Sequence, residues 1–237
     1  MQTLLAWSGG KDAAWTLHAL RQRGDVEVVG LLTTITREHD RVSMQGIRRS
    51  VLHAQARAAG LPLIEAEIPA ACGNDDYDAA MTAALAEAAA RWPALHAVAF
   101  GDLFLEDIRA YRVERLARVG WDVLAPLFGS DTAALAREMQ AGGLRAALCC
   151  VDTTQLDAAF AGRDFDEALL RELPPGVDPC GENGEFHTCV HAGPMFDAPL
   201  SLVRGDTVLR DARFAYTDFE RAAACQAMCS PMKLAMK

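Results

Sequence analysis

Five residues near the start of the chain have the types and spacing of an anion-binding loop. Ser8, Gly9, Gly10, Lys11 and Asp12 stand between an apolar run at 2–7 and a segment with helical spacing at 13–23. A strand, a glycine turn and a helix start in this order leave backbone N–H groups free at the positive end of the helix dipole. Lys11 is also the only lysine in the first 232 residues. The segment therefore predicts a phosphate-binding loop.

The details of this loop favour ATP with a metal ion. It is not a Walker A loop, because Leu5 stands where that pattern needs glycine and Asp12 stands where it needs Ser or Thr. A carboxylate directly after Lys11 repels bare phosphate, whereas an Mg²⁺ ion can bridge Asp12 to the pyrophosphate portion of ATP. The alternative is an ordinary strand-to-helix turn that Asp12 caps.

A second group of reactive side chains lies far along the chain. Residues 178–188 read D-P-C-G-E-N-G-E-F-H-T, which places Glu182, Glu185 and His187 within six positions. Such a density of titratable groups on a glycine-rich turn is typical of a catalytic or substrate-orienting loop. The alternative is a solvated hairpin turn with Asn183 and Gly184 at its tip.

The elements that must position these groups alternate between strand and helix. Apolar runs predict strands at 2–7, 26–35, 61–68, 95–100 and 122–125, and helical spacing predicts helices at 13–23, 46–60, 77–92 and 106–119. This alternation predicts a parallel sheet with right-handed crossovers. Ligands of such sheets lie beyond the carboxyl ends of the strands, where the phosphate loop falls.

The regular alternation of strands and helices ends after Pro126. A helix is expected at 131–141, a strand at 144–151, helical segments up to 173, and then short strands to about 219 that are punctuated by Gly and Pro. We therefore predict an α/β nucleotide-binding domain over 1–128 and a smaller mixed α+β subdomain over 129–221. A loosely ordered tail is expected over 222–237.

Composition limits the location and the partners of the protein. The 237 residues carry 32 acidic and 23 basic side chains, a net charge of -9, which argues against binding a long polyanion such as tRNA. Apolar runs are broken well before the roughly 18 residues that a membrane helix needs, and no basic leader precedes the first strand, so a cytoplasmic, membrane-free protein is expected. The arginines at 37, 41, 48, 49 and 57 form either a solvated helix face or a guide for an acidic substrate.

Seven cysteines without the density of a secreted scaffold predict reduced thiols. Cys180, Cys189, His187 and His191 could be drawn as a zinc site, but they lack C-x-x-C spacing and straddle the proposed substrate loop, so we do not assign zinc.

The two loops together resemble known proteins. Ser-Gly-Gly-Lys-Asp after the first strand resembles the PP-loop ATP pyrophosphatase superfamily, and the stretch at 178–188 resembles the G-E-N/G-G-E-F/Y signature of the diphthine ammonia ligase family. Gly101-Asp102, Tyr111-Arg112-Val113-Glu114 and 126–129 (P-L-F-G) agree with that family. The resemblance implies a Rossmann-like sheet of the adenine nucleotide alpha hydrolase type. Ala13 departs from the superfamily motif, which usually ends in Ser, and Asn183 replaces the glycine of the family's eukaryotic and archaeal form.

The resemblance also implies an activity, in which the enzyme adenylates a substrate carboxylate, releases pyrophosphate and amidates the acyl-adenylate with ammonia. Carried over residue by residue, it implies catalytic roles for Lys11, Asp12, Glu182, Glu185 and His187. It implies that ATP and Mg²⁺ meet Ser8, Gly9, Gly10, Lys11, Asp12 and Gly101, with Asp12 on the metal. It implies that the substrate meets Asp102, Arg112, Glu114, Gly181, Asn183 and Thr188.

Two other functions stay open on the sequence. The same sheet could serve a non-catalytic regulator that binds an adenine nucleotide. A PP-loop enzyme that modifies tRNA is the other alternative, although the acidic charge balance and the lack of the C-x-x-C pairs of sulfur-inserting relatives count against it. The acceptor is expected to be a small or protein-borne carboxylate, and a homodimer is one possible assembly.

Overall fold

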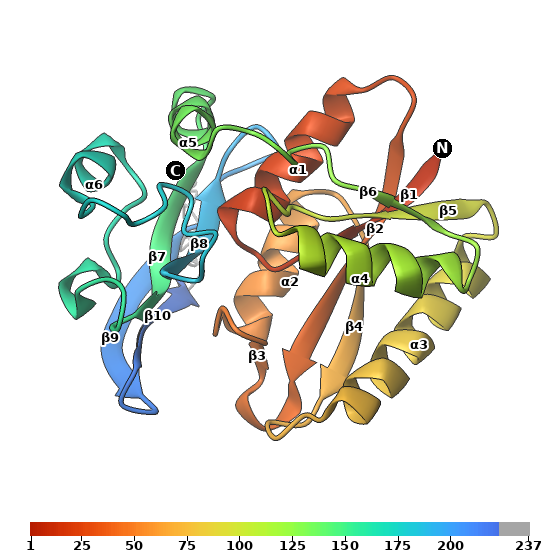
Figure 1. Cartoon of the computed structure of the whole chain (residues 1–237), viewed down its shortest axis with the longest axis horizontal. Coiled ribbons are helices and arrows are strands. Elements are labelled where there is room, and N and C mark those ends of the chain that lie inside the picture. The colour runs from red at the N-terminus through yellow and green to blue at the C-terminus, as the bar shows by residue number, and fades with distance from the viewer. Residues whose placement is uncertain (223–237) are drawn as a thin grey trace, which may run out of the picture.

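The computed structural model describes residues 1–222 and contains two β-sheets that lie side by side, with helices packed around them (Figure 1). Most of the tail for which we predicted loose order, 223–237, lies outside the described residues, together with Cys225 and Cys229. Among the described residues, no helix combines the length and the apolar character needed to cross a membrane.

The first sheet is mostly parallel, as the sequence predicted. Its strands are β1 (Gln2–Ala6), β2 (Glu27–Thr36), β3 (Arg41–Val42), β4 (Leu63–Ile68), β5 (Leu95–Ala99) and β6 (Asp122–Leu124). The strands pair in the order β3-β2-β1-β5-β6, and β4 pairs with β2. All pairs are parallel except β2 with β3. The predicted Rossmann-like class is therefore confirmed.

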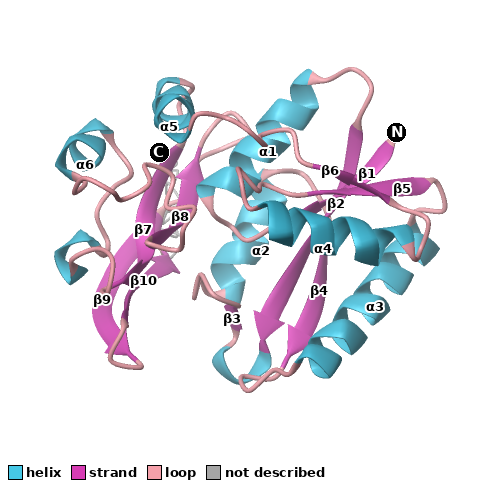
Figure 2. Cartoon of the chain, in the orientation of Figure 1, coloured by secondary structure: helices cyan, strands magenta, loops and turns pink. Residues whose placement is uncertain are grey.

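Helices cover both faces of this sheet, as Figure 2 shows. They are α1 (Lys11–Gln22), α2 (Arg49–Ala58), α3 (Asn74–Arg91) and α4 (Glu106–Ala117). Side chains alternate along a strand, so Leu5 and Leu31 pack in one core with α1 and α2, while Leu4 and Leu32 pack in another with α3 and α4. The near-continuous apolar strands thus reflect burial on two faces.

The second sheet is antiparallel. Its strands β7 (Arg145–Asp152), β8 (Phe186–Ala192), β9 (Leu202–Arg210) and β10 (Phe214–Arg221) pair in the order β8-β7-β10-β9. The core on the α1 and α2 side of the first sheet continues into this sheet through Phe165, Phe186 and Ala215. The two sheets therefore share one apolar core, and the boundary at residue 128 stays a prediction.

The later elements differ in detail from the sequence expectation. The helix at 131–141 is confirmed as α5 (Thr132–Ala141), but the helical segments expected up to 173 amount only to η2 (Ala158–Phe160) and the six-residue α6 (Glu167–Glu172). The strands expected to be short include nine-residue β9 and eight-residue β10. These two strands form a hairpin with many exposed side chains. The alternation of apolar and polar residues that predicts a strand is therefore weak in this part of the sequence.

One small element was not predicted. After β2 the chain makes the short helix η1 (Arg37–His39) and turns back as β3, which pairs with the last two residues of β2. Because β4 occupies one edge of β2, β3 must lie on the other edge, beyond the point where β1 ends. The polar segment 37–42 therefore folds over the carboxyl ends of the first sheet, beside the phosphate loop.

Candidate active site

The phosphate loop has the predicted geometry. It leaves β1 at Ala6, and Gly9 adopts a left-handed φ of +79° that an L side chain rarely tolerates. Gly10 is the N-cap of α1 and has no side-chain cap, although its own N–H donates to Ser8 Oγ at 3.3 Å. The first turn of the helix thus points its amides toward the loop, as an anion site requires.

The outer edge of β8 holds this loop in place. Val190 N donates to the Gly9 carbonyl at 3.0 Å, and Lys11 N donates to Thr188 Oγ1 at 3.0 Å. The backbones approach so closely that a Cβ on Gly10 would lie 3.2 Å from the carbonyl oxygen of Thr188. The loop of the first sheet and the edge strand of the second therefore form one structure.

Gln55 completes this attachment, and the sequence analysis missed it. Its side chain is fully buried, and Nε2 donates to the carbonyls of Gly9 at 3.0 Å and Val190 at 2.7 Å. Its Oε1 accepts a hydrogen bond from Trp7 Nε1 at 3.2 Å. The sequence did contain a signal: Gln55 lies three residues after Leu52, on the apolar stripe of its helix. A glutamine there is expected to be buried, and a buried amide must find hydrogen-bond partners.

Lys11 is buried between the two sheets. Its ammonium donates to both carboxylate oxygens of Asp12, at 3.0 and 2.8 Å, and to the carbonyl of Cys180. The rings of Phe165 and Phe186 lie 5.7 and 5.6 Å from Nζ. Burial lowers the pKa of Lys11, but the neighbouring Asp12 outweighs it, so the net pKa is raised and the ammonium stays charged.

Glu182 lies next to the same loop. Its Oε1 accepts a hydrogen bond from Leu103 N at 2.8 Å, which brings the 178–188 loop to the end of β5. Burial raises the pKa of Glu182 to about 7, and the negative charge of Asp12 acts in the same direction. A carboxyl group with such a pKa exchanges its proton near neutral pH, as a general acid or base requires.

Gly101 and Asp102 also meet the loop. A Cβ on Gly101 would lie 2.8 Å from the carbonyl carbon of Asp12, so only glycine allows the end of β5 to pack against α1. Asp102 forms an ion pair with Arg112, whose guanidinium stacks 4.2 Å from the Phe100 ring centroid. The first turn of α1 is thereby enclosed from the β5 side.

His187 is a half-buried residue of β8. It pairs with Cys150 of the neighbouring strand β7, and paired residues of neighbouring strands point to the same face of the sheet. Burial lowers the pKa of His187 to about 4, and the charge of Lys11 lowers it further. The imidazole is therefore neutral at pH 7 and able to accept a hydrogen bond, whereas its low pKa disfavours uptake of a proton.

Not all of the other residues predicted for the site lie at the phosphate loop. Glu185 is buried within the 178–188 loop, where its carboxylate accepts from Asp178 N at 2.9 Å and Asn183 N at 2.9 Å. Gly181 turns the same loop with a φ of +68°. Glu114 is exposed on α4 and pairs with Arg118, away from the phosphate loop. Glu185 thus shapes the loop, and the functional roles predicted for these residues stay predictions.

A magnesium ion at Asp12 is compatible with the chemistry of the site. Asp12 keeps 26% of its side chain exposed, and a carboxylate has about four lone-pair positions, of which Lys11 uses part. Mg²⁺ commonly binds to one or two carboxylates and the phosphates of a nucleotide. Among residues 1–222, no three His, Cys, Asp or Glu side chains are grouped to hold a metal by themselves.

The fold and this site define a Rossmann-like α/β protein with a glycine turn between its first strand and its first helix. Comparison with known proteins places it more closely. The diphthamide synthase N-terminal domain matches residues 1–121 and the C-terminal domain of the same enzyme matches 131–224. The chain therefore belongs to the diphthamide synthase family.

Two curated relatives resemble most of the chain. A diphthine–ammonia ligase of Schizosaccharomyces pombe is 27% identical over 88% of this chain, and one of Danio rerio is 28% identical over 90% of it. The matched region spans 37% of the length of the yeast protein and 91% of the fish protein.

Gln55 gives a testable prediction. Gln55→Leu leaves the indole of Trp7 and the carbonyl of Val190 without partners, at about 1 to 3 kcal/mol for each buried group. We expect a loss of at least about 2 kcal/mol in the free energy of unfolding, measured by urea denaturation. Gln22→Leu, at the exposed end of α1, is the matched control and should change stability by less than about 0.5 kcal/mol. Equal effects of the two substitutions would show that Gln55 does not anchor the loop.

Proposed function

We propose that this protein is an ATP-dependent ligase that adenylates a carboxylate substrate and amidates it with ammonia. The observation that carries the proposal is the contact between the phosphate loop and the 178–188 loop, in which Lys11 donates to Thr188 and to the carbonyl of Cys180. Glu182 of the same loop accepts a hydrogen bond from Leu103 N, just after β5. Membership of the diphthamide synthase family and the names of the two relatives support a ligase of this kind.

The proposed reaction has two steps that balance. A carboxylate oxygen of the substrate attacks the α-phosphorus of ATP, and the bond to pyrophosphate breaks. Ammonia then attacks the carbonyl carbon of the acyl-adenylate, AMP leaves with the bonding electrons, and the nitrogen gives up a proton. The overall products are an amide, AMP and pyrophosphate.

Each step needs groups that the site contains. The positive end of α1 suits the phosphates, and Asp12 would hold a magnesium ion that neutralises charge on the departing pyrophosphate. Glu182, with a pKa of about 7, is the proposed base for the ammonium nitrogen. Neutral His187, on the second sheet, is proposed as an additional hydrogen-bond acceptor for the nitrogen.

The products of ATP turnover test the proposal. The purified protein is incubated with ATP, Mg²⁺, ammonium and a panel of small carboxylic acids, and nucleotides are separated by chromatography. We expect AMP and pyrophosphate, and only with an acceptor. Release of ADP and phosphate would rule out the adenylation step, and ATP that persists with every acceptor would favour the nucleotide-binding regulator. Tight, salt-sensitive tRNA binding would instead favour tRNA modification.

Lys11 should matter for the rate. If its ammonium stabilises the charge that develops on pyrophosphate, Lys11→Ala should lose about 3 to 4 kcal/mol of transition-state stabilisation, roughly a hundred- to thousandfold in kcat. Because the half-buried Asp12 also loses its partner, the comparison must use the folded fraction, which circular dichroism reports. A loss of tenfold or less in folded protein would show that the lysine is peripheral.

Glu182 should set the pH dependence. A carboxyl with a raised pKa is protonated below that value and ionised above it, so a base with a pKa of about 7 gains activity as the pH rises through 7. At a fixed concentration of free ammonia, we expect kcat for amide formation to show this rise and Glu182→Gln to abolish it. Glu182→Gln should leave ATP affinity unchanged. Equal damage to ATP binding and to turnover would contradict this role.

A further inference from the structure

The 178–188 loop begins with a carboxylate that the proposed chemistry does not use. Asp178 Oδ1 accepts hydrogen bonds from the backbone N–H groups of Cys180 at 2.8 Å and Glu182 at 3.2 Å. The carbonyl of Asp178 also accepts from Gly181 N at 2.8 Å. Three consecutive N–H groups of the loop are therefore bonded to one residue, and residues 178–182 form a tight turn around it.

This turn fixes the direction of a group that contacts Lys11. The N–H of Gly181 and the C=O of Cys180 belong to one peptide unit, and in a trans peptide they point in opposite directions. The Gly181 N–H is bonded to Asp178. The Cys180 carbonyl therefore points the other way, where it accepts from the Lys11 ammonium. That ammonium has three protons, and its other two bonds go to Asp12, so its position at the phosphate loop depends on the turn.

The same turn holds the proposed base. The N–H of Glu182 is bonded to the Asp178 carboxylate, while the side chain of Glu182 accepts from Leu103 N at 2.8 Å, just after β5. Glu182 is thus held by its backbone and by its carboxylate. This position keeps the side chain half-buried, and burial is the main cause of its raised pKa.

The other oxygen of Asp178 ties the turn to α5. Asp178 Oδ2 accepts from Thr132 Oγ1 at 2.6 Å, at the first residue of that helix. The Cys180 thiol donates to the carbonyl of Thr132 at 3.3 Å. A movement of the turn would therefore break contacts with a helix, and both carboxylate oxygens of Asp178 take part in fixing the loop.

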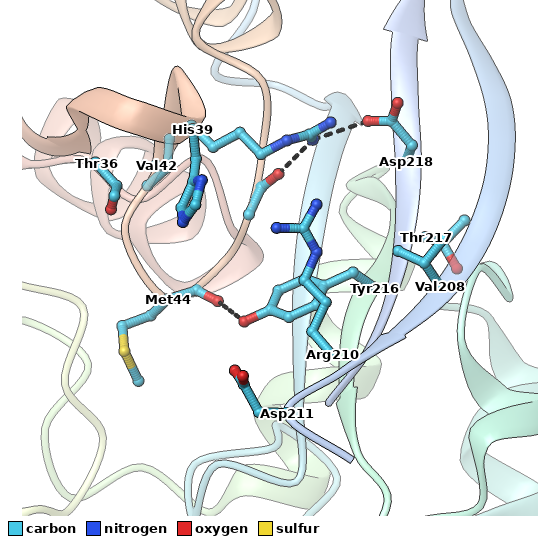
Figure 3. A pocket seen from close by; sticks show the side chains of 12 residues that line it. Thr36, His39, Val42, Met44, Val208, Arg210, Asp211, Tyr216, Thr217 and Asp218 are labelled. Carbon is cyan, nitrogen blue, oxygen red and sulfur yellow. Dashed lines mark hydrogen bonds and ion pairs between the residues drawn. The ribbon is translucent and has the colours of Figure 1, made fainter. Parts of the chain in front are cut away.

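A second carboxylate, Asp218, joins the two sheets outside the two loops. It lies at a cavity of about 170 Å³ that β10 and the 36–46 segment line, where it accepts from Arg41 at 2.8 Å and pairs with Arg48 (Figure 3). In the same cavity the hydroxyl of Tyr216 donates to the carbonyl of Met44 at 3.2 Å. Asp218 thus makes as many contacts as Asp178, but to groups that belong to neither loop.

We propose that Asp178 is a positioning residue of the active site, whose carboxylate folds the 178–182 turn so that Cys180 fixes the Lys11 ammonium and Glu182 reaches the end of β5. It acts through geometry rather than charge, because its bonds to the two loop N–H groups need only an acceptor oxygen. The part of this inference that concerns turnover rests on the proposed ligase function.

The titration of Glu182 tests the proposal without any substrate. Glutamate side chains are labelled with ¹³C, their carboxyl signals are followed with pH by NMR, and Glu182→Gln identifies the signal. In the parent chain we expect a midpoint near 7. Asp178→Ala releases the turn, so Glu182 gains water and its midpoint should fall by at least about one pH unit toward that of an exposed glutamate. Asp178→Asn keeps an acceptor oxygen for both N–H groups and should keep the midpoint of the parent.

Two matched variants separate positioning from a general loss of packing. Asp157→Ala removes a carboxylate that accepts, as Asp178 does, from the backbone N–H two residues further on at 2.8 Å, but in η2. Asp218→Ala removes the carboxylate between the sheets. Both should leave the Glu182 midpoint unchanged. If Asp178→Ala does not fold, Thr132→Val takes its place: it removes one partner of the carboxylate and should lower the midpoint, and Thr132→Ser should restore it.

The outcomes separate the positioning role from the ligase. An unchanged Glu182 midpoint in Asp178→Ala, an equal fall in Asp178→Asn, or an equal fall in either control overturns the positioning role. If the chain converts ATP to AMP, Asp178→Ala should lower kcat about a hundredfold in folded protein and Asp178→Asn should restore most of it, whereas an unchanged kcat in Asp178→Ala overturns the role as well. The expected midpoints without AMP release from any acceptor leave the positioning role standing and contradict the ligase.

Discussion

The edge of β8 docked on the phosphate loop is the contact on which the site depends. The Gly9 carbonyl accepts from Val190 N and from the buried amide of Gln55, and Lys11 N donates to Thr188. A loop of two glycines has many conformations of its own, so these bonds select one of them. The two sheets also share an apolar core, so the loop lies between two parts of the fold that are packed together.

Burial gives the side chains of the site their chemical character. The pKa of Glu182 is raised to about 7 and that of His187 is lowered to about 4, because leaving water disfavours the charged form of each group. Lys11 keeps its charge in the same surroundings because the carboxylate of Asp12 lies 2.8 Å away. Neighbouring ionisable groups thus hold different charges at neutral pH, which proton transfer requires.

Membership of the family indicates the type of site in this chain, but it does not identify the substrate. This chain shares both domains of diphthamide synthase but is under 30% identical to the two relatives, and it has Asn183 at the tip of the 178–188 loop. The residues that face the cavity at Tyr216 come from the 36–46 segment and from the β9–β10 hairpin, both outside the two signature loops.

Sequence by itself determined the parallel sheet and the loop at Ser8 to Asp12, because local period and glycine placement are written along the chain. That the second loop belongs to the same site was implied only by the resemblance to a family. Sequence did not separate Glu182 from Glu185, which differ only in whether the carboxylate meets the end of β5 or the backbone of its own loop. It also missed Gln55, and the cavity between β3 and β10. These depend on contacts between residues more than forty positions apart, which only the packing of the two sheets decides.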